Sequence, residues 1–133
     1  PGLVEGAREF VEALRRDGYR LHICSNGFHE VQYSKLHACG LFDFFQTIVL
    51  SEDAGVNKPH PDFFRFAFEK TGATLDSTVM VGDNPETDIK GAHDVGLRTI
   101  FFNRHPDEHP ASAALADYTV GSLSEVYDVV KKL

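Results

Sequence analysis

The 133-residue chain has the composition of one globular domain, with 42% hydrophobic and 25% charged residues. Its formal net charge of −7 argues against a general nucleic-acid binder, which needs clustered Lys and Arg to neutralise phosphates. The eleven Phe exclude intrinsic disorder, and no apolar run approaches the ~20 residues of a membrane span.

The first half of the chain predicts two helices and two strands. Apolar residues at every third or fourth position predict a helix over 4–17 that stops at Gly18. The apolar run 19–24 predicts a short buried strand. A second helix over 31–39 follows, and the β-branched run 47–50 predicts the next strand.

The second half continues the alternation. A polar loop over 51–60 leads to a helix over 61–71, whose apolar face includes several phenylalanines. The apolar runs 78–81 and 98–102 predict strands, and the segment from 85 to 95 between them predicts a helix.

The helix starts of the second half carry capping signals. Pro61 suits the first position of a helix, and Asn84 can cap the helix whose first turn holds Pro85. After a loop rich in Pro, His and acidic residues, a short strand is expected over 118–120. The sequence 122–125, Ser-Leu-Ser-Glu, predicts a capping box that opens the last helix.

Strands that alternate with helices are typical of right-handed βαβ units, in which helices cover both faces of a parallel sheet. The sequence therefore predicts an α/β fold, a Rossmann-like three-layer sandwich with a mainly parallel sheet, formed by residues 1–133 as a single partial domain. Because the alternation begins with a helix, we expect the first strand of such a sheet to be missing. The chain starts with Pro1 instead of Met, which indicates a processed product or part of a longer protein.

Ligands of open parallel sheets bind beyond the carboxyl ends of the strands, so the residues that follow each strand are the candidate site. These residues are Ser25, Asn26 and Gly27 after the first strand, Lys58 in the loop after the second, and Asp83 and Asp88 after the third. We expect all of them to converge on one edge of the sheet.

Each residue type suits one task in such a site. Ser25 offers a hydroxyl donor, and the backbone N–H groups that follow it favour an anion. Lys58 supplies a point charge for a phosphate or a developing oxyanion. Asp83 and Asp88 offer the hard oxygen ligands that Mg²⁺ prefers. Together they predict a site for a phosphate and a divalent metal.

Each of these residues alone has a plainer interpretation. Residues 25–27 would more often be an ordinary turn, and Lys58 an unremarkable loop lysine. Asp83 could simply complement a helix dipole, and Asp88 could be a solvated helix residue. The hypothesis of a site depends on their coincidence at three successive strand ends.

Three stretches resemble motifs in the core domain of the haloacid dehalogenase-like hydrolase superfamily, and the likeness runs over nearly the whole chain. Residues 21–27 resemble its apolar strand ending in Ser or Thr, 56–59 its Lys-Pro loop, and 82–88 its acidic metal-binding motif. The longer stretch 25–36 is more similar to the pyrimidine 5′-nucleotidase branch than to the dehalogenase branch.

The resemblance implies a role for each candidate residue. Ser25 and Asn26, with Gly27, would hold the phosphate. Lys58 would be catalytic and would neutralise the charge of the nucleophile and of the phosphate. Asp83 would bind Mg²⁺, and Asp88 would support the metal shell or Lys58.

The chain departs from the family at the first motif. Family members carry an Asp-x-Asp pair on the first strand, where the first Asp attacks phosphorus and the second is the general acid/base. Asp17 lies in a helix-end turn, and neither Asp43 nor Asp53 follows a first-strand pattern. The cap that family members insert after that strand is absent too. We therefore expect the nucleophile to lie outside this chain.

The resemblance implies the C-terminal core of a Mg²⁺-dependent phosphomonoester hydrolase. It would be a phosphatase, in particular a nucleotidase, acting on a small phosphorylated substrate through an aspartyl-phosphate. The alternative is a non-catalytic domain that keeps the fold as a binding or scaffold element. We expect neither a nucleic acid nor a membrane as a partner.

By the same resemblance, the missing strand lies between the strand that ends at Ser25 and the strand that ends at Gly82. We expect this gap to be closed. Either the two strands pair directly, or a segment from a second copy or from an N-terminal piece fills the slot.

The chain has two cysteines, Cys24 and Cys39, which could in principle pair. Cys24 closes an apolar run and Cys39 ends a helical pattern, so buried free thiols are the better interpretation. Free thiols favour a reducing compartment, and we expect the cytoplasm.

Overall fold

The computed structural model describes residues 5–27, 34, 36–105, 107–108 and 110–133. Its strands are β1(His22–Ser25), β2(Thr47–Leu50), β3(Val79–Gly82), β4(Arg98–Phe102) and β5(Tyr118–Val120). Its α-helices are α1(Ala7–Arg16), α3(Ser51–Ala54), α4(Pro61–Thr71), α5(Gly91–Asp94) and α6(Leu123–Lys132). Its 3-10 helices are η1(Phe42–Phe44), η2(Leu75–Ser77) and η4(Ala111–Leu115), and η3(Pro85–Lys90) is a π-helix. The α/β class predicted from the sequence is confirmed.

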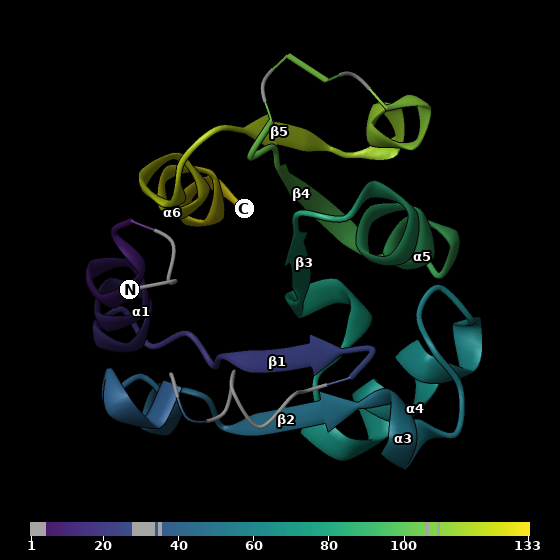
Figure 1. Cartoon of the computed structure of the whole chain (residues 1–133), viewed down its shortest axis with the longest axis horizontal. Coiled ribbons are helices and arrows are strands. Elements are labelled where there is room, and N and C mark those ends of the chain that lie inside the picture. The colour runs from purple at the N-terminus through teal and green to yellow at the C-terminus, as the bar shows by residue number, and fades with distance from the viewer. Residues whose placement is uncertain (1–4, 28–33, 35, 106, 109) are drawn as a thin grey trace.

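The strands form two parallel sheets, one with the order β1-β2 and one with the order β3-β4-β5. Within the part of the chain that the structure describes, β1 and β3 are not hydrogen-bonded to each other. Of the two alternatives for closing the gap, direct pairing of these strands is therefore not observed among the described residues, and filling of the slot by a further segment stays a prediction. Figure 1 shows β1 beside β2 and β3 beside β4, with no strand drawn between β1 and β3.

Helices cover the sheets from two sides, which gives the three layers that the alternation predicts (Figure 1). On one side, Leu14 of α1 and Val126 of α6 pack against Ile100 of β4. On the other side, Phe63 and Phe64 of α4 pack against Val49 of β2. Each layer buries one apolar face of its helices, and this burial is the main source of stability in such a fold.

Burial across the strands follows from their pairing. Residues Thr99 to Phe102 of β4, which is hydrogen-bonded on both edges, are all buried. Val81 of β3 is 36% exposed, and the residues of β1 are only half buried. The least covered apolar side chains of the sheets therefore lie on the strands with one unpaired edge.

The capping signals read from the sequence act as predicted. Pro61 occupies the first position of α4 and Pro85 the first turn of η3. The Asn84 side chain accepts the backbone N–H groups of Glu86 and Thr87. The Ser122 hydroxyl oxygen accepts the N–H of Glu125 at 3.2 Å, and Ser122 is the N-cap of α6, as the capping box predicts.

Some local features differ from the sequence prediction. The strand expected over 19–24 starts only at His22, and the loop expected over 51–60 contains the short helix α3. Segment 85–90 is a π-helix rather than an α-helix. The helix expected over 31–39 includes positions 31–33 and 35, which lie outside the described residues.

No helix in the described part of the chain is both long enough and apolar enough to cross a bilayer.

Asp17, at the end of α1, joins this helix to α6. Its carboxylate accepts hydrogen bonds from the Tyr127 hydroxyl and from Lys131 Nζ, the latter at 3.1 Å. The hydrogen bond from Tyr127 and the neighbouring Lys131 ammonium hold the pKa of Asp17 below its ordinary value. The charged form of Asp17 thus contributes to docking α6 against α1.

Asp17→Asn is expected to lower the free energy of unfolding near neutral pH. A carboxyl whose pKa is lowered on folding stabilises the fold above its unfolded pKa, and this contribution is lost as pH falls through its folded pKa. The difference between wild type and variant should therefore stay constant from about pH 7 to about pH 5 and shrink as pH falls further, through the lowered folded pKa of Asp17. Urea titrations over this range would measure it, with Asp128→Asn, exposed on α6, as the control. A difference independent of pH would contradict the assignment.

Candidate active site

Lys58 is the centre of the candidate site. Its side chain is 8% exposed, and its Nζ lies 2.6 Å from Asp88 Oδ1. The same Nζ donates a hydrogen bond to the carbonyl of Cys24, at the end of β1, over 3.0 Å. A buried ammonium requires a countercharge and hydrogen-bond acceptors, and this environment supplies both.

The backbone of Lys58 is held by Asn26. The Asn26 Oδ1 accepts the Lys58 N–H at 2.7 Å, and its Nδ2 donates to the Lys58 carbonyl at 3.0 Å. This two-point contact fixes the loop that carries Lys58 against the end of β1. Asn26 was predicted to hold phosphate, and here its side-chain amide positions the lysine loop.

Ser25 and Gly27 form the turn that ends β1. The Ser25 hydroxyl donates to the Gly27 carbonyl, and its oxygen accepts the Gly27 N–H at 3.3 Å. Both residues lie beside the Asn26 contact with the lysine loop. The structure thus keeps the predicted phosphate-binding turn at the same strand end as Lys58.

Asp88, which reaches Lys58, lies in the π-helix η3. Its Oδ2 accepts the backbone N–H of Asn84 at 3.3 Å, which brings the carboxylate back over the end of β3. π-Helical turns are rare and are frequently found at functional sites. The Asp88 carboxylate is nearly as buried as the Lys58 ammonium.

Asp83 has a more open position. Its side chain is 50% exposed, and its Oδ2 lies 3.5 Å from Arg104 Nη1. Mg²⁺ is usually held by one or two carboxylates together with waters and substrate oxygens. The described residues contain no group of three or more His, Cys, Asp or Glu that could hold a metal. The accessible Asp83 carboxylate is the kind of oxygen ligand that fits Mg²⁺ held in this open manner, whereas the Asp88 carboxylate is engaged by Lys58 and by the Asn84 N–H.

The structure joins Asn26, Lys58 and Asp88 across its two sheets, whereas Asp83 pairs with Arg104. Lys58 belongs to the half that contains β1 and β2, whereas Asp88 follows β3 in the other half. The ion pair between them and the contact of Nζ with Cys24 therefore link the carboxyl ends of both sheets.

Arg104 was not among the site residues predicted from the sequence. This residue lies two positions after the end of β4. Ligands of parallel sheets bind beyond the carboxyl ends of the strands, so Arg104 also lies where a ligand would bind. Its contact with Asp83 places a guanidinium at the edge of the predicted metal site. The contact between Lys58 Nζ and the ring of Phe63, at 5.9 Å, was also not predicted.

Cys24, whose carbonyl accepts a hydrogen bond from Lys58, has a thiol that is unsuited to nucleophilic catalysis. Burial raises the pKa of its thiol, although the neighbouring Lys58 ammonium acts in the opposite direction. A protonated thiol is a poor nucleophile. Cys24 and Cys39 are both free, as predicted, but each is partly rather than fully buried.

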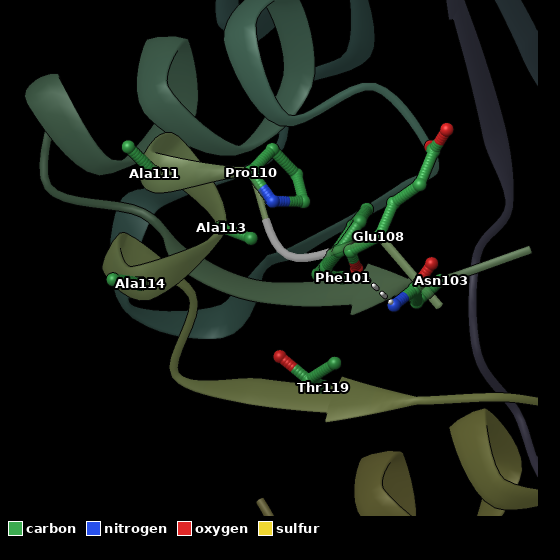
Figure 2. Close-up of a pocket in the computed structure, with 8 residues that line it drawn as sticks. All are labelled: Phe101, Asn103, Glu108, Pro110, Ala111, Ala113, Ala114 and Thr119. Atoms are coloured by element: carbon green, nitrogen blue, oxygen red, sulfur yellow. Dashed lines mark hydrogen bonds between the residues drawn. The ribbon is translucent and has the colours of Figure 1, made fainter. Parts of the chain in front are cut away.

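A pocket of about 360 Å³ lies between η4 and the strands β4 and β5 (Figure 2). It is lined by Phe101, Asn103, Glu108, Pro110, Ala111, Ala113, Ala114 and Thr119. This lining includes none of the predicted site residues. The candidate site around Lys58 is therefore separate from this pocket.

Residues 2–96 match the family model of the haloacid dehalogenase-like hydrolases. A pyrimidine 5′-nucleotidase of Escherichia coli, YjjG, is 38% identical over 128 residues, which cover 96% of this chain and 56% of that protein. A glyceraldehyde 3-phosphate phosphatase of Methanocaldococcus jannaschii is 33% identical over 120 residues, 90% of this chain and 53% of that protein.

Solved structures of haloacid dehalogenase-like proteins are similar to this chain as well. The putative HAD-hydrolase YfnB of Bacillus subtilis, bound to magnesium, has a TM-score of 0.83 at 32% identity over 97% of this chain and 55% of that chain. A HAD phosphatase of Thermococcus onnurineus has a TM-score of 0.83 at 31% identity over 96% of this chain and 58% of its own. The chain spans about half the length of the curated relatives it matches.

Proposed function

Because this chain belongs to the haloacid dehalogenase-like hydrolases, we propose that it forms the C-terminal core of a Mg²⁺-dependent phosphomonoester hydrolase. The observation that carries the proposal is the buried Lys58, paired with Asp88 at 2.6 Å at the carboxyl ends of the strands. Keeping a cation in such a place is costly unless its charge is used or compensated. A phosphate that approaches these strand ends would meet this charge.

In the proposed reaction, an aspartate carboxylate from outside these 133 residues attacks the phosphorus of the substrate. The bond from phosphorus to the ester oxygen breaks, and the leaving oxygen takes a proton from the second aspartate of the Asp-x-Asp pair, which would be the general acid. Water then attacks the aspartyl-phosphate and gives its proton to that second aspartate, which releases inorganic phosphate and restores both carboxyl groups. Lys58 would hold the nucleophile and the phosphate oxygens together by neutralising their negative charge.

The remaining site residues position these partners. The turn formed by Ser25 and Gly27 offers hydroxyl and backbone donors to the phosphate, and Asn26 keeps the Lys58 loop in place. Asp83 would hold Mg²⁺, and Asp88 would support the metal shell or Lys58. When bound, the metal would neutralise charge on the transferring phosphoryl group.

The substrate would be a small phosphomonoester, and in particular a nucleoside monophosphate. Support comes from relatives named as phosphatases and from the 38% identity to a pyrimidine 5′-nucleotidase. The stretch 25–36, which resembles the nucleotidase branch, includes positions 28–33 and 35, and these lie outside the described residues.

The nucleophile would arrive on a strand between β1 and β3. Each of these strands is hydrogen-bonded on one edge only in the described structure, and unpaired edges attract a further strand. An N-terminal segment with an Asp-x-Asp pair, or the same segment of a second copy, would complete the sheet and place its carboxylate beside Lys58.

The two unpaired cysteines favour a reducing compartment, so we propose that the enzyme works in the cytoplasm.

Asp83→Asn in the full-length protein is the test of the proposed metal site. Replacing a charged oxygen ligand by a neutral amide is expected to weaken Mg²⁺ binding on the order of tenfold or more and to lower phosphatase activity with it. The fold should persist, because the Asp83 side chain is half exposed. Mg²⁺ titrations of nucleoside monophosphate hydrolysis and circular dichroism would measure the two effects.

Asp94→Asn is the matched control, since Asp94 also pairs with a cation on an exposed surface but lies away from the strand ends. Its Mg²⁺ dependence should equal that of wild type. Wild-type protein that hydrolyses no phosphomonoester would favour the alternative of a non-catalytic domain. Normal Mg²⁺ dependence in Asp83→Asn would remove Asp83 from the site.

A further inference from the structure

Gly82, the last residue of β3, lies in direct contact with Asp88. A β-carbon at this position would be 2.4 Å from both the Cβ and Oδ2 of Asp88 and 2.6 Å from its Cγ. Carbon atoms in van der Waals contact lie roughly 3.5–4.0 Å apart. No side chain therefore fits at position 82 while Asp88 keeps its place.

The requirement for glycine at this position is steric rather than conformational. Gly82 is not among the glycines with positive φ, so its backbone suits any residue. A glycine inside a strand often marks a place where another group approaches the backbone closely. At Gly82, the group that approaches is the Asp88 side chain.

We propose that Gly82 is a positioning residue for the phosphoryl-transfer site, because it lets Asp88 lie over the end of β3 and thereby sets the place of the Lys58 ammonium. The chain of contacts is short. Asp88 Oδ1 lies 2.6 Å from Lys58 Nζ, which lies 3.0 Å from the Cys24 carbonyl. The effect on catalysis rests on the proposed function, whereas the contact between Gly82 and Asp88 does not.

Asp88 cannot simply turn away from an added methyl group. One of the clashing atoms is its own Cβ, whose position is set by the backbone of the π-helix η3. The start of that helix is held by the Asn84 side chain, which accepts N–H groups from Glu86 and Thr87. Relief of the clash must therefore move the helix or the strand, and either movement displaces Asp88 from Lys58.

The first experiment measures activity in the full-length protein. Gly82→Ala leaves Lys58 and Asp88 in the sequence but should lower kcat/KM on the order of ten- to hundredfold, the scale expected when a catalytic group shifts by about 1 Å. Gly121→Ala is the control, because a β-carbon there would meet no atom closer than 3.7 Å. Gly121→Ala should keep wild-type kcat/KM.

The second experiment asks whether the effect passes through Asp88. Asp88→Gly removes every side-chain atom with which the methyl group would clash, so we compare Gly82→Ala in the wild-type and Asp88→Gly backgrounds. Urea unfolding without metal or substrate should show a lower midpoint for Gly82→Ala in the wild-type background and almost no further change in Asp88→Gly. The loss of kcat/KM should likewise disappear in Asp88→Gly, which a generally destabilising substitution would not do.

Equal losses in both backgrounds, or wild-type midpoint and activity for Gly82→Ala, would overturn the proposal. If Gly82→Ala fails to fold, recovery of folding in the double variant supports the proposal, and continued failure overturns it. The proposed function and the role of Gly82 can fail separately. An inactive wild-type protein refutes the proposed function, while the unfolding experiment still decides whether Gly82 places Asp88.

Discussion

Lys58→Ala is expected to reduce kcat/KM for phosphomonoester hydrolysis on the order of hundredfold or more. Removing one charged group directed at a developing negative charge has this scale of effect in water-excluded sites. Stability should fall as well, by about 3–5 kcal/mol, because the buried Asp88 carboxylate would lose its partner. Activity must therefore be measured at a temperature where circular dichroism shows that the variant is folded.

Two controls separate the chemical role of Lys58 from its structural role. Lys90→Ala removes an exposed lysine whose Nζ lies 2.9 Å from Asp94, and it should change activity little. The double variant Lys58→Met/Asp88→Asn replaces the buried ion pair by neutral groups, so it should recover stability without recovering activity. Normal kcat/KM in Lys58→Ala would exclude Lys58 from the reaction.

The second large effect concerns the 133 residues expressed alone. Turnover of p-nitrophenyl phosphate or of nucleoside monophosphates with Mg²⁺ should be undetectable, a loss on the order of 10⁴-fold or more relative to a protein that includes the Asp-x-Asp strand. Transfer through an enzyme aspartate needs that aspartate, and positioning residues alone contribute much less. Phosphate release measured over long incubation provides the test.

The control for that experiment is the longer protein assayed under the same conditions. Its activity should depend on the first aspartate of the Asp-x-Asp pair. Robust turnover by the 133 residues alone, abolished by one substitution within them, would mean that the nucleophile lies in this chain.

Local signals in the sequence were sufficient to predict most of the elements. The strand at 47–50 and the strand at 98–102 appear with the predicted bounds, because a β-branched or apolar run between turn residues determines both. Asn84 and Ser122 cap their helices as predicted, since a cap depends only on the next three residues.

Features that depend on distant partners could not be predicted. Asn26 holds the backbone of Lys58, 32 residues later, and nothing next to Asn26 in sequence indicates this contact. The π-helical turn at 85–90 accompanies the packing of Asp88 onto Gly82, which no helical periodicity reveals. The pairing of β1 with β2 alone likewise depends on which strand edges meet in three dimensions.

The burial of Lys58 and Asp88, set against the exposure of Asp83, has a consequence for the evolution of such chains. A lineage that stopped hydrolysing phosphomonoesters would still be selected to keep the Lys58–Asp88 pair, because losing either partner destabilises the fold. Asp83 has no such protection, since a half-exposed surface pair such as its contact with Arg104 adds about 0–1 kcal/mol. Neutral drift would therefore remove Asp83 first. Homologues that retain Lys58 and Asp88 but have lost Asp83 would be those that kept the architecture after abandoning catalysis.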